Sequence, residues 1–430
     1  MTINSAFQQL RVVVVGQGYV GLPLAVRAAE VGHQVVGLDI DGQRVKRLVL
    51  GESYVEDIPD SRLAPPLASG SYRPSLDASD CADFDIAIVT VPTPLRDGVP
   101  DLSYVEDAAR TLGRRLRRGA TIVLESTTYP GTTEELFGPL LENVSGLTVG
   151  RDFHLGYSPE RIDPGNPNWT LENTPKVVSG IDVASAEAVS RFYSALVDTV
   201  VPVTTCKEAE LTKLLENTFR HVNIALANEL AIFAHELGID IWTAIDAAAT
   251  KPFGFMRFTP GPGVGGHCLP IDPSYLSWRV QRTLGRSFRF VELANDVNNH
   301  MPDYVVRRLI DGLNERKKSL KGSRILLLGL AYKANTGDAR ETPAARIAEL
   351  LAGMGADVRA SDPHVDDAHP RATDLEQVRH VEATPENLAA ADAVVLLADH
   401  DAFDYPLITA HAPYILDCRR RLVGAHVDSL

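Results

Sequence analysis

One segment near the N-terminus constrains the fold of this chain more than any other. Residues 11–15 read as a buried parallel strand, and the glycine motif GQGYVG at residues 16–21 follows directly. Residues 22–31 then read as a helix, and residues 33–40 as a second strand that contains Asp39. A GxGxxG motif alone is weak evidence. Placed between a strand and a helix, with an acid about 20 residues further on, it predicts a dinucleotide-binding Rossmann unit.

The residues of this motif have distinct tasks in such a unit. Gly16 permits the tight turn, Gly18 lets a pyrophosphate approach the N-terminus of the helix, and Gly21 allows close helix packing. Asp39 is expected to accept hydrogen bonds from the adenosine ribose, and its charge repels a 2′-phosphate. The motif therefore predicts NAD rather than NADP as the cofactor. The contacts expected from the motif are Gly16, Gly18, Tyr19, Val20 and Gly21.

Further strands are predicted at residues 85–91, 121–125, 154–157 and 176–179, with helices between most of them. This alternation is typical of a doubly wound α/β sheet, in which ligands bind beyond the carboxyl ends of the strands. Hydroxyl-rich segments follow three of these strands: TVPTP at 90–94, STTYPGT at 126–132 and YSPER at 157–161. Ordinary turn chemistry explains any single Ser or Thr in them equally well.

The C-terminal part repeats the first pattern in weaker form. A strand is predicted at residues 324–328, a helix at 343–353 and another strand at 356–361. The GxGxxG motif is absent, and two cations, Lys333 and Arg340, appear instead. The pattern predicts a second Rossmann-like unit that binds a nucleotide or diphosphate. The alternative is a degenerate duplicate that serves only as scaffold.

The middle of the chain is helical. Residues 207–237 have sustained apolar periodicity without an internal proline or glycine before residue 238, which predicts one long helix that links two domains and offers a dimer interface. Lys213 and Asn217 are four residues apart and therefore share a face, with His221 one turn further. On a solvated helix these would be ordinary surface residues. A second helical region is predicted at residues 272–314.

A loop rich in glycine and proline, GPGVGGHCLPIDP at residues 261–273, contains Cys268. Glycines let a substrate approach the backbone, and prolines hold the shape of a loop. A helix that begins near Asp272 would favour the thiolate form of the cysteine. The loop alone is equally consistent with an inert, buried cysteine.

Composition excludes several other classes of protein. The formal net charge of -14 argues against a nucleic-acid partner, and no apolar run approaches the roughly 18 residues of a membrane span. Residues 1–10 lack the pattern of a secretory signal. The cysteines are scattered and form no CxxC pair, so neither a metal site nor a disulfide framework is expected, and a reducing cytoplasm is predicted. They are Cys81, Cys206, Cys268 and Cys418.

Together these motifs resemble the UDP-glucose/GDP-mannose dehydrogenase family of NAD-dependent nucleotide-sugar 6-dehydrogenases. The resemblance spans nearly the whole chain, and the joint occurrence of the motifs is highly specific. They are GxGxxG, VPTP, STTYPGTT, SPER, KLLENTFR, GPGVGGHCLPIDP and GLAYKANTGDARETP. The resemblance implies two Rossmann-like doubly wound α/β domains joined by a long central helix and a helical region. The implied boundaries are 1–205 for the NAD domain, 206–315 for the central domain with the catalytic loop, and 316–430 for the nucleotide-sugar domain.

The resemblance also implies roles for individual residues. Cys268 matches the catalytic thiol and Asp272 the carboxylate that assists water or proton transfer. Lys213 and Asn217 match the pair near the reacting oxygen. The other catalytic matches are Thr127 and Glu160. The matches to cofactor contacts outside the first motif are Thr93, Thr127 and Arg340, and the candidate substrate contacts are Glu160, Arg161, Lys213, Asn217, Arg257, Gly265 and Lys333.

The implied reaction is a four-electron oxidation of a C6 alcohol to a carboxylate by two NAD⁺, through a thiohemiacetal and a thioester on Cys268. The GGHC loop is most similar to the branch that acts on UDP-N-acetylhexosamines, especially UDP-N-acetylglucosamine. Pro164 stands where many UDP-glucose enzymes have a second glutamate, which agrees with that branch. UDP-N-acetylmannosamine and UDP-glucose follow, and dTDP-glucose and GDP-mannose come last.

Two other classes compete with this interpretation. A single-step hydroxyacid or sugar-phosphate dehydrogenase needs no cysteine, and a nucleotide sensor on the same scaffold needs no catalytic groups. Cys268 is the residue that discriminates against the single-step enzyme, which stays an alternative, and the joint presence of Cys268, Lys213, Asn217 and Asp272 argues against the sensor. Arg257, just before the loop, is a candidate sugar or phosphate contact or a plain surface residue. The expected partners are therefore a nucleotide-diphosphate sugar and a further copy of the chain in a homodimer or larger assembly.

Overall fold

The computed structural model describes residues 8–55, 57–96, 98–163, 166, 168–266, 269–365, 375 and 378–430. The chain divides into two compact units, Met1–Glu216 and Asn217–Leu430, each described by itself below. Within the described ranges, no helix is both long enough and apolar enough to cross a membrane.

The first unit contains a sheet of eight described strands in the order β10-β9-β8-β7-β4-β1-β2-β3. The part from β3 through β1 to β8 has the strand order of a dinucleotide-binding Rossmann fold, which confirms the predicted fold class. The strands of the sheet are β1 (Arg11–Val15), β2 (Gln34–Leu38), β3 (Tyr72–Ser75), β4 (Ile86–Val89), β7 (Thr121–Leu124), β8 (His154–Tyr157), β9 (Lys176–Gly180) and β10 (Val200–Pro202). A separate two-stranded ribbon pairs β5 (Leu95–Arg96) with β6 (Val99–Pro100).

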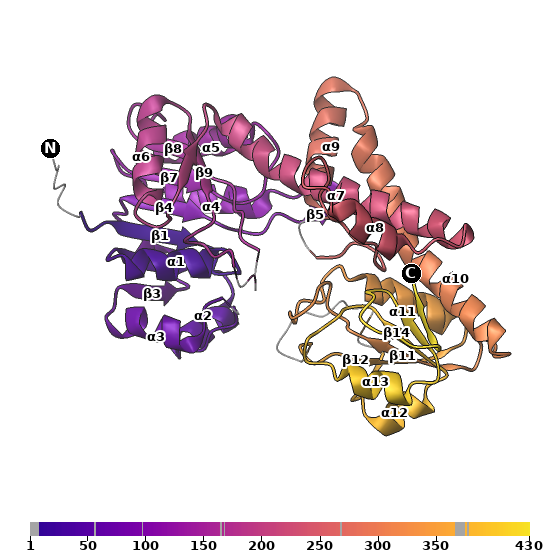
Figure 1. The fold of residues 1–430 in the computed structure, drawn as a ribbon. Helices are drawn as coiled ribbons and strands as arrows, with labels where there is room; N and C mark the ends of the chain where they lie inside the picture. The colour runs from indigo at the N-terminus through magenta and orange to yellow at the C-terminus, as the bar shows by residue number, and fades with distance from the viewer. Residues whose placement is uncertain are drawn as a thin grey trace. The chain divides into compact units, whose positions relative to one another are not determined.

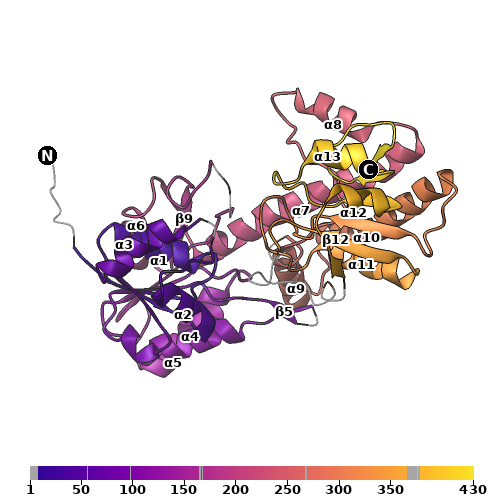
Figure 2. The same cartoon turned by 90° about the horizontal axis from the view of Figure 1, so that it is seen from below.

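Helices cover both faces of this sheet. In Figure 2, α1, α3 and α6 lie on one side of the strands and α4 and α5 on the other. The core between α1, α6 and the strands is made of Val, Leu, Ile and aromatic side chains, such as Val14, Leu24 and Phe192. The helices are α1 (Gly21–Glu30), α2 (Gly42–Val49), α3 (Asp60–Ala68), η1 (Ala78–Cys81), α4 (Ser103–Gly113), η2 (Thr133–Phe137), α5 (Gly138–Ser145) and α6 (Val183–Tyr193).

One strand of this unit departs from the parallel pattern. β9 pairs with β8 in antiparallel fashion, in the register Gly156↔Gly180 and Tyr157↔Ser179, whereas the other strand pairs of the sheet are parallel. Hydrophobic periodicity locates a strand but says nothing of its direction, so the sequence could not reveal this reversal. The reversal lays β9 alongside the segment that follows β8.

A helical region joins the first sheet to the second. α7 (Cys206–Glu236) forms the predicted long helix, and α8 (Ile241–Ala249) follows it. The helical region predicted at residues 272–314 is broken, because α9 (Asp272–Leu284) ends at Gly285 and α10 (Arg289–Glu315) begins after it. Gly285 has a φ of 63°, a left-handed conformation that terminates a helix and that glycine adopts at little cost.

The second unit contains the predicted second Rossmann-like sheet. Its described strands are all paired in parallel, in the order β13-β12-β11-β14-β15-β16. Figure 1 shows α10 and α11 on one side of this sheet and α12 and α13 on the other, and each side has its own apolar core. The elements are β11 (Arg324–Leu328), α11 (Pro343–Gly353), β12 (Asp357–Ser361), β13 (Arg379–His380), α12 (Pro385–Ala390), β14 (Ala393–Leu396), α13 (Tyr405–His411), β15 (Ile415–Asp417) and β16 (Val427–Ser429).

Candidate active site

The glycine motif forms the turn between β1 and α1. Gly16 has a φ of 91°, and a Cβ there would lie 2.7 Å from the Thr90 carbonyl oxygen. A Cβ on Gly21 would lie 1.8 Å from the Gly16 carbonyl oxygen, so the close packing that Gly21 permits is with the motif's own turn. A Cβ on Gly18 would meet no atom within 4 Å. The space beside Gly18 therefore lies open at the start of α1, where no side chain caps the helix.

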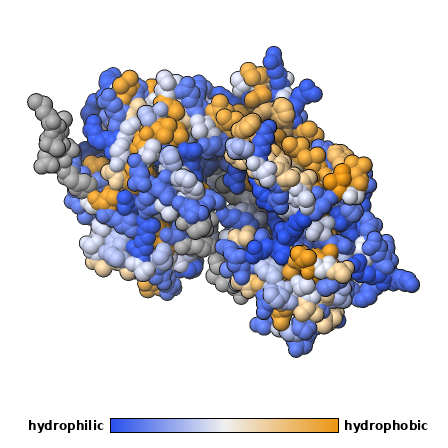
Figure 3. All heavy atoms as spheres, viewed as in Figure 1, coloured by the Kyte–Doolittle hydropathy of each residue, from blue (hydrophilic) through white to orange (hydrophobic). Residues whose placement is uncertain are grey.

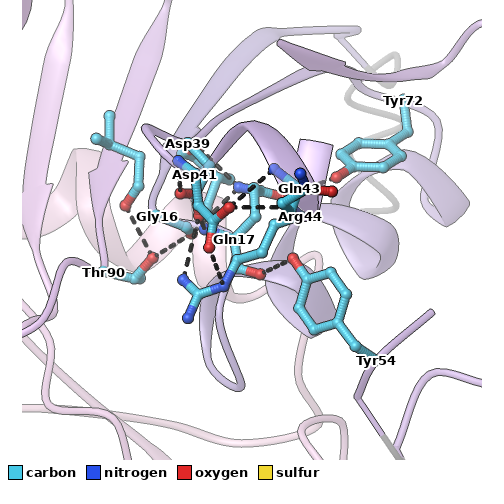
Figure 4. A network of polar contacts seen from close by, with 11 residues as sticks. Gly16, Gln17, Asp39, Asp41, Gln43, Arg44, Tyr54, Tyr72 and Thr90 are labelled. Atoms are coloured by element: carbon cyan, nitrogen blue, oxygen red, sulfur yellow. Dashed lines mark hydrogen bonds and ion pairs between the residues drawn. The ribbon is translucent and has the colours of Figure 1, made fainter. Parts of the chain in front are cut away.

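Asp39 is buried at the end of β2 and is held by the motif (Figure 4). Its Oδ2 accepts a hydrogen bond from the Gln17 amide at 2.7 Å, and its Oδ1 accepts one from the Asp41 amide at 2.9 Å. Each carboxylate oxygen has a second lone pair, so capacity for two ribose hydroxyls remains. Arg44 lies 3.7 Å from Oδ2. Uncapped helix amides, open space at Gly18 and a fixed acid fit the pyrophosphate and ribose of NAD.

Gln17, the residue between the first two glycines, stabilises this turn through hydrogen bonds of its side chain and its carbonyl (Figure 4). Its fully buried side chain donates to the Val14 carbonyl at 2.9 Å and accepts from the Tyr72 hydroxyl at 2.8 Å. The Tyr54 hydroxyl donates to the Gln17 carbonyl. Burial, and after it the nearby Asp39 charge, raises the pKa of Tyr54, which keeps that hydroxyl protonated as a donor. The sequence motif gave no signal for this bracing.

The segments beyond the next strands supply the other predicted cofactor contacts. Thr90 lies after β4 and donates to the carbonyls of Val15 and Gly16, both at 2.9 Å, so it ties the two strand ends together. Thr93 is buried a few residues further, and Thr127 is half-buried after β7. These positions are at the carboxyl ends of neighbouring parallel strands, where ligands of such sheets bind.

The structure brings Glu160 and Lys213 together. Lys213 Nζ lies 3.3 Å from Glu160 Oε2, and both side chains are about one-tenth exposed or less. The other oxygen of Glu160 accepts a hydrogen bond from the Ile162 amide. Arg161, the next residue, points elsewhere: it pairs with Glu216 at 2.7 Å and donates to the Pro175 carbonyl at 2.6 Å.

Asn217 stands one helical turn after Lys213 on α7. Its amide donates to Asp272 Oδ2 at 2.7 Å, and Asp272 is buried at the first residue of α9. Two residues separated by 55 positions in sequence are thereby joined. The predicted start of a helix at Asp272 is also seen. Cys268, four positions earlier, lies outside the described residues.

His221, one turn further along α7, is held by a buried network of amides. Its Nε2 pairs with Asn295 Oδ1 at 2.8 Å, so its Nδ1 is free to accept from Asn298 at 3.3 Å. Asn298 Oδ1 accepts from Asn228 at 2.9 Å, and Asn228 Oδ1 accepts from the Gly261 amide at 2.9 Å. Burial lowers the pKa of His221, which keeps the ring neutral. The network fixes the first residue of the glycine-rich loop.

The glycines of that loop permit close packing. A Cβ on Gly265 would lie 2.6 Å from the Glu341 carbonyl oxygen, and one on Gly266 would lie 2.8 Å from the Tyr332 ring. A Cβ on Gly261 would lie 2.8 Å from a guanidinium nitrogen of Arg419. The expectation that these glycines mainly admit substrate therefore gives an incomplete reason, because the loop also lies directly against the second Rossmann-like sheet's connections.

The cations of the second sheet have different environments. Arg340 is held by Asp338 at 2.6 Å, and Lys333 lies 5.8 Å from the centre of the Tyr332 ring. Arg257 forms an exposed pair with Asp246 at 2.8 Å. Arg419, which the sequence analysis missed, donates to the Leu397 carbonyl at 2.7 Å and lies beside Gly261. Among the described residues no carboxylate lies within ion-pair distance of Arg419. Its only signal in the sequence is a cation two residues after a strand.

Asp362 occupies the place in the second sheet that Asp39 occupies in the first, but it is used differently. It accepts hydrogen bonds from the amides of Leu330 at 2.6 Å and Ala331 at 3.0 Å, and from His400 at 3.0 Å. Burial opposes its ionisation, but these hydrogen bonds, that of His400 foremost, lower the pKa of Asp362 to about 2. The carboxylate thus fixes the connection that leads to Lys333.

Comparisons with known proteins agree with this geometry. Three models of the UDP-glucose/GDP-mannose dehydrogenase family match the chain: the NAD binding domain at residues 10–197, the central domain at 207–300 and the UDP binding domain at 326–423. The UDP-N-acetyl-D-mannosamine dehydrogenase of Pyrococcus horikoshii is 37% identical over 395 residues, 92% of this chain and 90% of the relative.

A further relative and a solved structure point in the same direction. The UDP-N-acetyl-D-glucosamine 6-dehydrogenase of Pseudomonas aeruginosa is 38% identical over 360 residues, which is 83% of this chain and 84% of the relative. The solved structure of the UDP-D-ManNAc dehydrogenase from Pyrococcus horikoshii matches with a TM-score of 0.87 and 34% identity, over 98% of this chain and 99% of that chain.

Proposed function

The chain belongs to the UDP-glucose/GDP-mannose dehydrogenase family of NAD-dependent oxidoreductases, and we propose that it oxidises C6 of a UDP-N-acetylhexosamine, foremost UDP-N-acetylglucosamine, to the carboxylate. The observation that carries the proposal is the buried ion pair, 3.3 Å long, between Glu160 and Lys213, which lies on the helix that also carries Asn217. A buried amine beside a carboxylate is a group that can move a proton rather than merely hold a charge.

In the first oxidation Lys213 acts as the base. The amine passes its own proton to Glu160 and takes the hydroxyl proton of C6, directly or through one water. Bound NAD⁺ supplies the hydride acceptor, and Thr127 and Thr93 lie on the segments that face it. Asn217, whose side chain is fixed by Asp272 at 2.7 Å, donates to the oxygen as it changes from alcohol to aldehyde.

The aldehyde is then captured by Cys268. The thiolate adds to the carbonyl carbon and a C–S bond forms, so the intermediate stays on the enzyme. Loss of a second hydride from that carbon, for which a second bound NAD⁺ would be the acceptor, would give a thioester on Cys268. Water adds to the thioester with Asp272 as general base, the C–S bond breaks, and the acid and the free thiol are released. The whole sequence consumes one alcohol, one water and two NAD⁺.

The diphosphate end of the substrate is assigned to the second sheet. Arg419 and Lys333 are the cations that hold it, and the backbone around Gly265 follows its length. An arginine without a carboxylate partner among the described residues is suited to a phosphate, because it offers several donors in one plane. Such remote contacts orient the sugar so that C6 reaches the reacting groups.

The apolar face of α7 supports a homodimer. Leu237 directly after this helix is exposed, and so are six large apolar side chains within it: Leu211, Leu215, Phe219, Leu226, Leu230 and Phe233. Figure 3 shows hydrophobic atoms gathered over the helices labelled α7 and α9 in Figure 1. Monomers rarely expose so continuous an apolar stripe, and a second copy of the chain would cover it.

Free Cys81, Cys206 and Cys418 accord with the proposed cytoplasmic location.

A panel of sugar nucleotides tests the substrate assignment. NADH formation is measured with UDP-N-acetylglucosamine, UDP-N-acetylmannosamine, UDP-glucose, dTDP-glucose and GDP-mannose. We expect UDP-N-acetylglucosamine to have the highest kcat/KM, by about tenfold or more over UDP-glucose. The mannosamine relatives favour the second candidate, and a higher kcat/KM for UDP-N-acetylmannosamine would replace the first. A preference for UDP-glucose or GDP-mannose would refute the hexosamine assignment.

A further inference from the structure

A second buried ion pair, between Glu125 and Lys176, lies next to the segment that carries Glu160, and no proposed catalytic step uses it. We propose that Glu125 and Lys176 are positioning residues that hold the Pro159–Glu160 segment, and so keep Glu160 in place against Lys213. The inference rests on the proposed role of the Glu160–Lys213 pair. Glu125 directly follows β7 and Lys176 begins β9, so both belong to the frame of the first sheet.

The pair is almost completely removed from solvent. Lys176 Nζ lies 3.0 Å from Glu125 Oε1, with side chains 6% and 2% exposed. Burying two charges costs about as much free energy as their attraction returns, so such a pair is a poor source of stability. An apolar pair of similar volume would serve the core as well. Its presence here therefore suggests a task other than stability.

That task is indicated by a contact that Lys176 makes outside the pair. Its ammonium donates to the Pro159 carbonyl at 3.2 Å, and Pro159 directly precedes Glu160. The ladder between β8 and β9 ends at the pair Tyr157↔Ser179. Beyond it, Ser158 Oγ donates to the Val177 carbonyl at 2.7 Å, and Lys176 makes the next link. Because β9 runs antiparallel to β8, the side chains of Ser158 and Lys176 continue the hydrogen bonds between the two strands as far as Pro159, the residue before Glu160.

Glu160 has little freedom once its backbone is fixed. One carboxylate oxygen accepts from the Ile162 amide, and the other faces Lys213 Nζ at 3.3 Å. A shift of the Pro159 carbonyl moves both contacts, because the two peptide groups are adjacent. A displacement of about 1 Å in a reacting group costs roughly a hundredfold in rate. Lys176 therefore acts on catalysis through the position of Glu160.

Tyr193 completes the frame. Its hydroxyl donates to Glu125, and its ring lies 5.1 Å from Lys176 Nζ. Burial, and after it the Glu125 charge, raises the pKa of Tyr193 well above its usual value, so the hydroxyl remains a donor. Glu125 is thereby held by Lys176 and Tyr193. Lys176 is held by Glu125, the Tyr193 ring and the Pro159 carbonyl.

The test removes the pair as a unit and asks whether the effect passes through Glu160. Removing one partner would leave a buried charge and risk the fold, so the double variant Glu125→Gln/Lys176→Met is used. It is made in the wild type and in a Glu160→Gln background. We expect kcat to fall about 10- to 100-fold in the wild type and less than about threefold in the second background, because contacting residues are not additive. The Kd for NAD should stay within about twofold in both.

Amide hydrogen exchange provides a readout that needs no substrate. In Glu125→Gln/Lys176→Met, exchange should quicken in residues 157–162 and stay unchanged in β1 and α1. Arg73→Met is the matched control, because it breaks the pair with Asp80 in the same unit, at 2.8 Å, on β3 at the opposite edge of the sheet, and should leave residues 157–162 unchanged.

Several results would overturn the proposal: unchanged kcat, an equal loss of kcat in both backgrounds, or unchanged exchange in residues 157–162. Absence of turnover by the wild type on every sugar nucleotide would instead refute the proposed function, and the exchange measurement would still decide whether the pair holds the segment.

Discussion

At the scale of single residues, the site depends on side chains whose partners leave them one orientation. Asp39 is fixed by two backbone amides, Glu160 by an amide and Lys213, and Asp272 by Asn217. Charged hydrogen bonds of this kind are stronger than neutral ones and fix geometry as well as charge. Preorganised groups do not have to reorient when charge develops during the reaction.

Lys213→Met tests the proposed base. It retains the apolar stem and removes the amine, so kcat should fall by about 10²- to 10⁴-fold while the Kd for NAD changes little. Lys207→Met is the matched control, since Lys207 is an exposed lysine on the same helix that pairs with Glu135 at 2.9 Å. Steady-state kinetics of both variants provide the comparison. Equal kcat values for Lys213→Met and the wild type would remove Lys213 from the mechanism.

Asp39→Asn tests the cofactor preference. The substitution removes the charge that repels a 2′-phosphate and weakens the bonds to the ribose hydroxyls. The KM for NAD should rise about 5- to 50-fold, and the preference for NAD over NADP should shrink. Asp41→Asn is the control, because Asp41 caps α2 and should affect stability more than cofactor choice. An unaltered NAD/NADP ratio of kcat/KM in Asp39→Asn would contradict the assignment.

At this scale the sequence predicted individual residues better than their partners. The four-residue spacing of Lys213 and Asn217 is a local property of a helix, so the sequence alone predicted that the two residues share a face. The partners Glu160 and Asp272 are 53 and 55 positions away, and only the fold joins them. Glu125, Lys176 and Arg419 carried no motif, so their burial and contacts could not be foreseen.

At the scale of elements, α7 connects the predicted site to the frame of the first sheet. Glu210, one turn before Lys213, is fully buried and accepts hydrogen bonds from the Gly131 amide at 2.5 Å and from the Thr133 amide at 2.8 Å. These contacts tie the helix to the STTYPGTT segment that contains Thr127. The helix that carries the proposed catalytic groups is thus fixed to the segment that contains the predicted cofactor contact Thr127.

Glu210→Gln tests this tie through pH. Burial raises the pKa of Glu210 from 4.5 to about 7, so the folded protein holds this proton more tightly than the unfolded chain. The stability from Glu210 is fully present below pH 4.5 and is lost as the pH rises through 7. Between pH 5 and 8 the wild type should lose about 2–3 kcal/mol that the variant does not lose.

The measurement for Glu210 is denaturant unfolding at pH 5 and pH 8. Glu208→Gln is the control, because Glu208 lies exposed at the start of the same helix. Parallel pH dependences of stability for the wild type and Glu210→Gln would show that the buried carboxyl titrates as it does in the unfolded chain, against the account given above.

Most of the long elements were predictable, because apolar runs and helical periodicity reveal them. α7 and α11 begin and end within a residue of their predicted bounds. Direction and short elements were not predictable. The reversal of β9 depends on pairing, β10 is a short edge strand that ends in proline, and the break after α9 depends on one glycine.

At the scale of the whole molecule, the chain combines two Rossmann-like sheets with one long helix that carries an exposed apolar stripe. Asp39 of the first sheet accepts hydrogen bonds from the glycine motif and is proposed to bind the ribose, whereas the equivalent Asp362 fixes the loop of its own sheet. Duplication of the fold therefore did not duplicate the site. The exposed stripe of α7 predicts that the molecule is complete only as an assembly of copies.

Leu226→Glu/Leu230→Glu tests the proposed assembly. Two carboxylates on the stripe would be buried without partners in a dimer, so the variant should have the mass of one 46.7 kDa chain while the wild type has at least twice that mass. Light scattering after size exclusion gives both masses. Val423→Glu is the control, because Val423 is an isolated apolar residue that is 90% exposed. A wild type of monomeric mass would contradict the prediction.

The central claim is a four-electron oxidation through a thioester on Cys268, and the most direct measurement is the number of NADH molecules formed per molecule of sugar acid. The account predicts two NADH per acid for the wild type, and for Cys268→Ser at most one NADH per turnover with release of aldehyde or stalling after the first oxidation. One NADH per product in the wild type, or two NADH per acid at normal rate in Cys268→Ser, would contradict it.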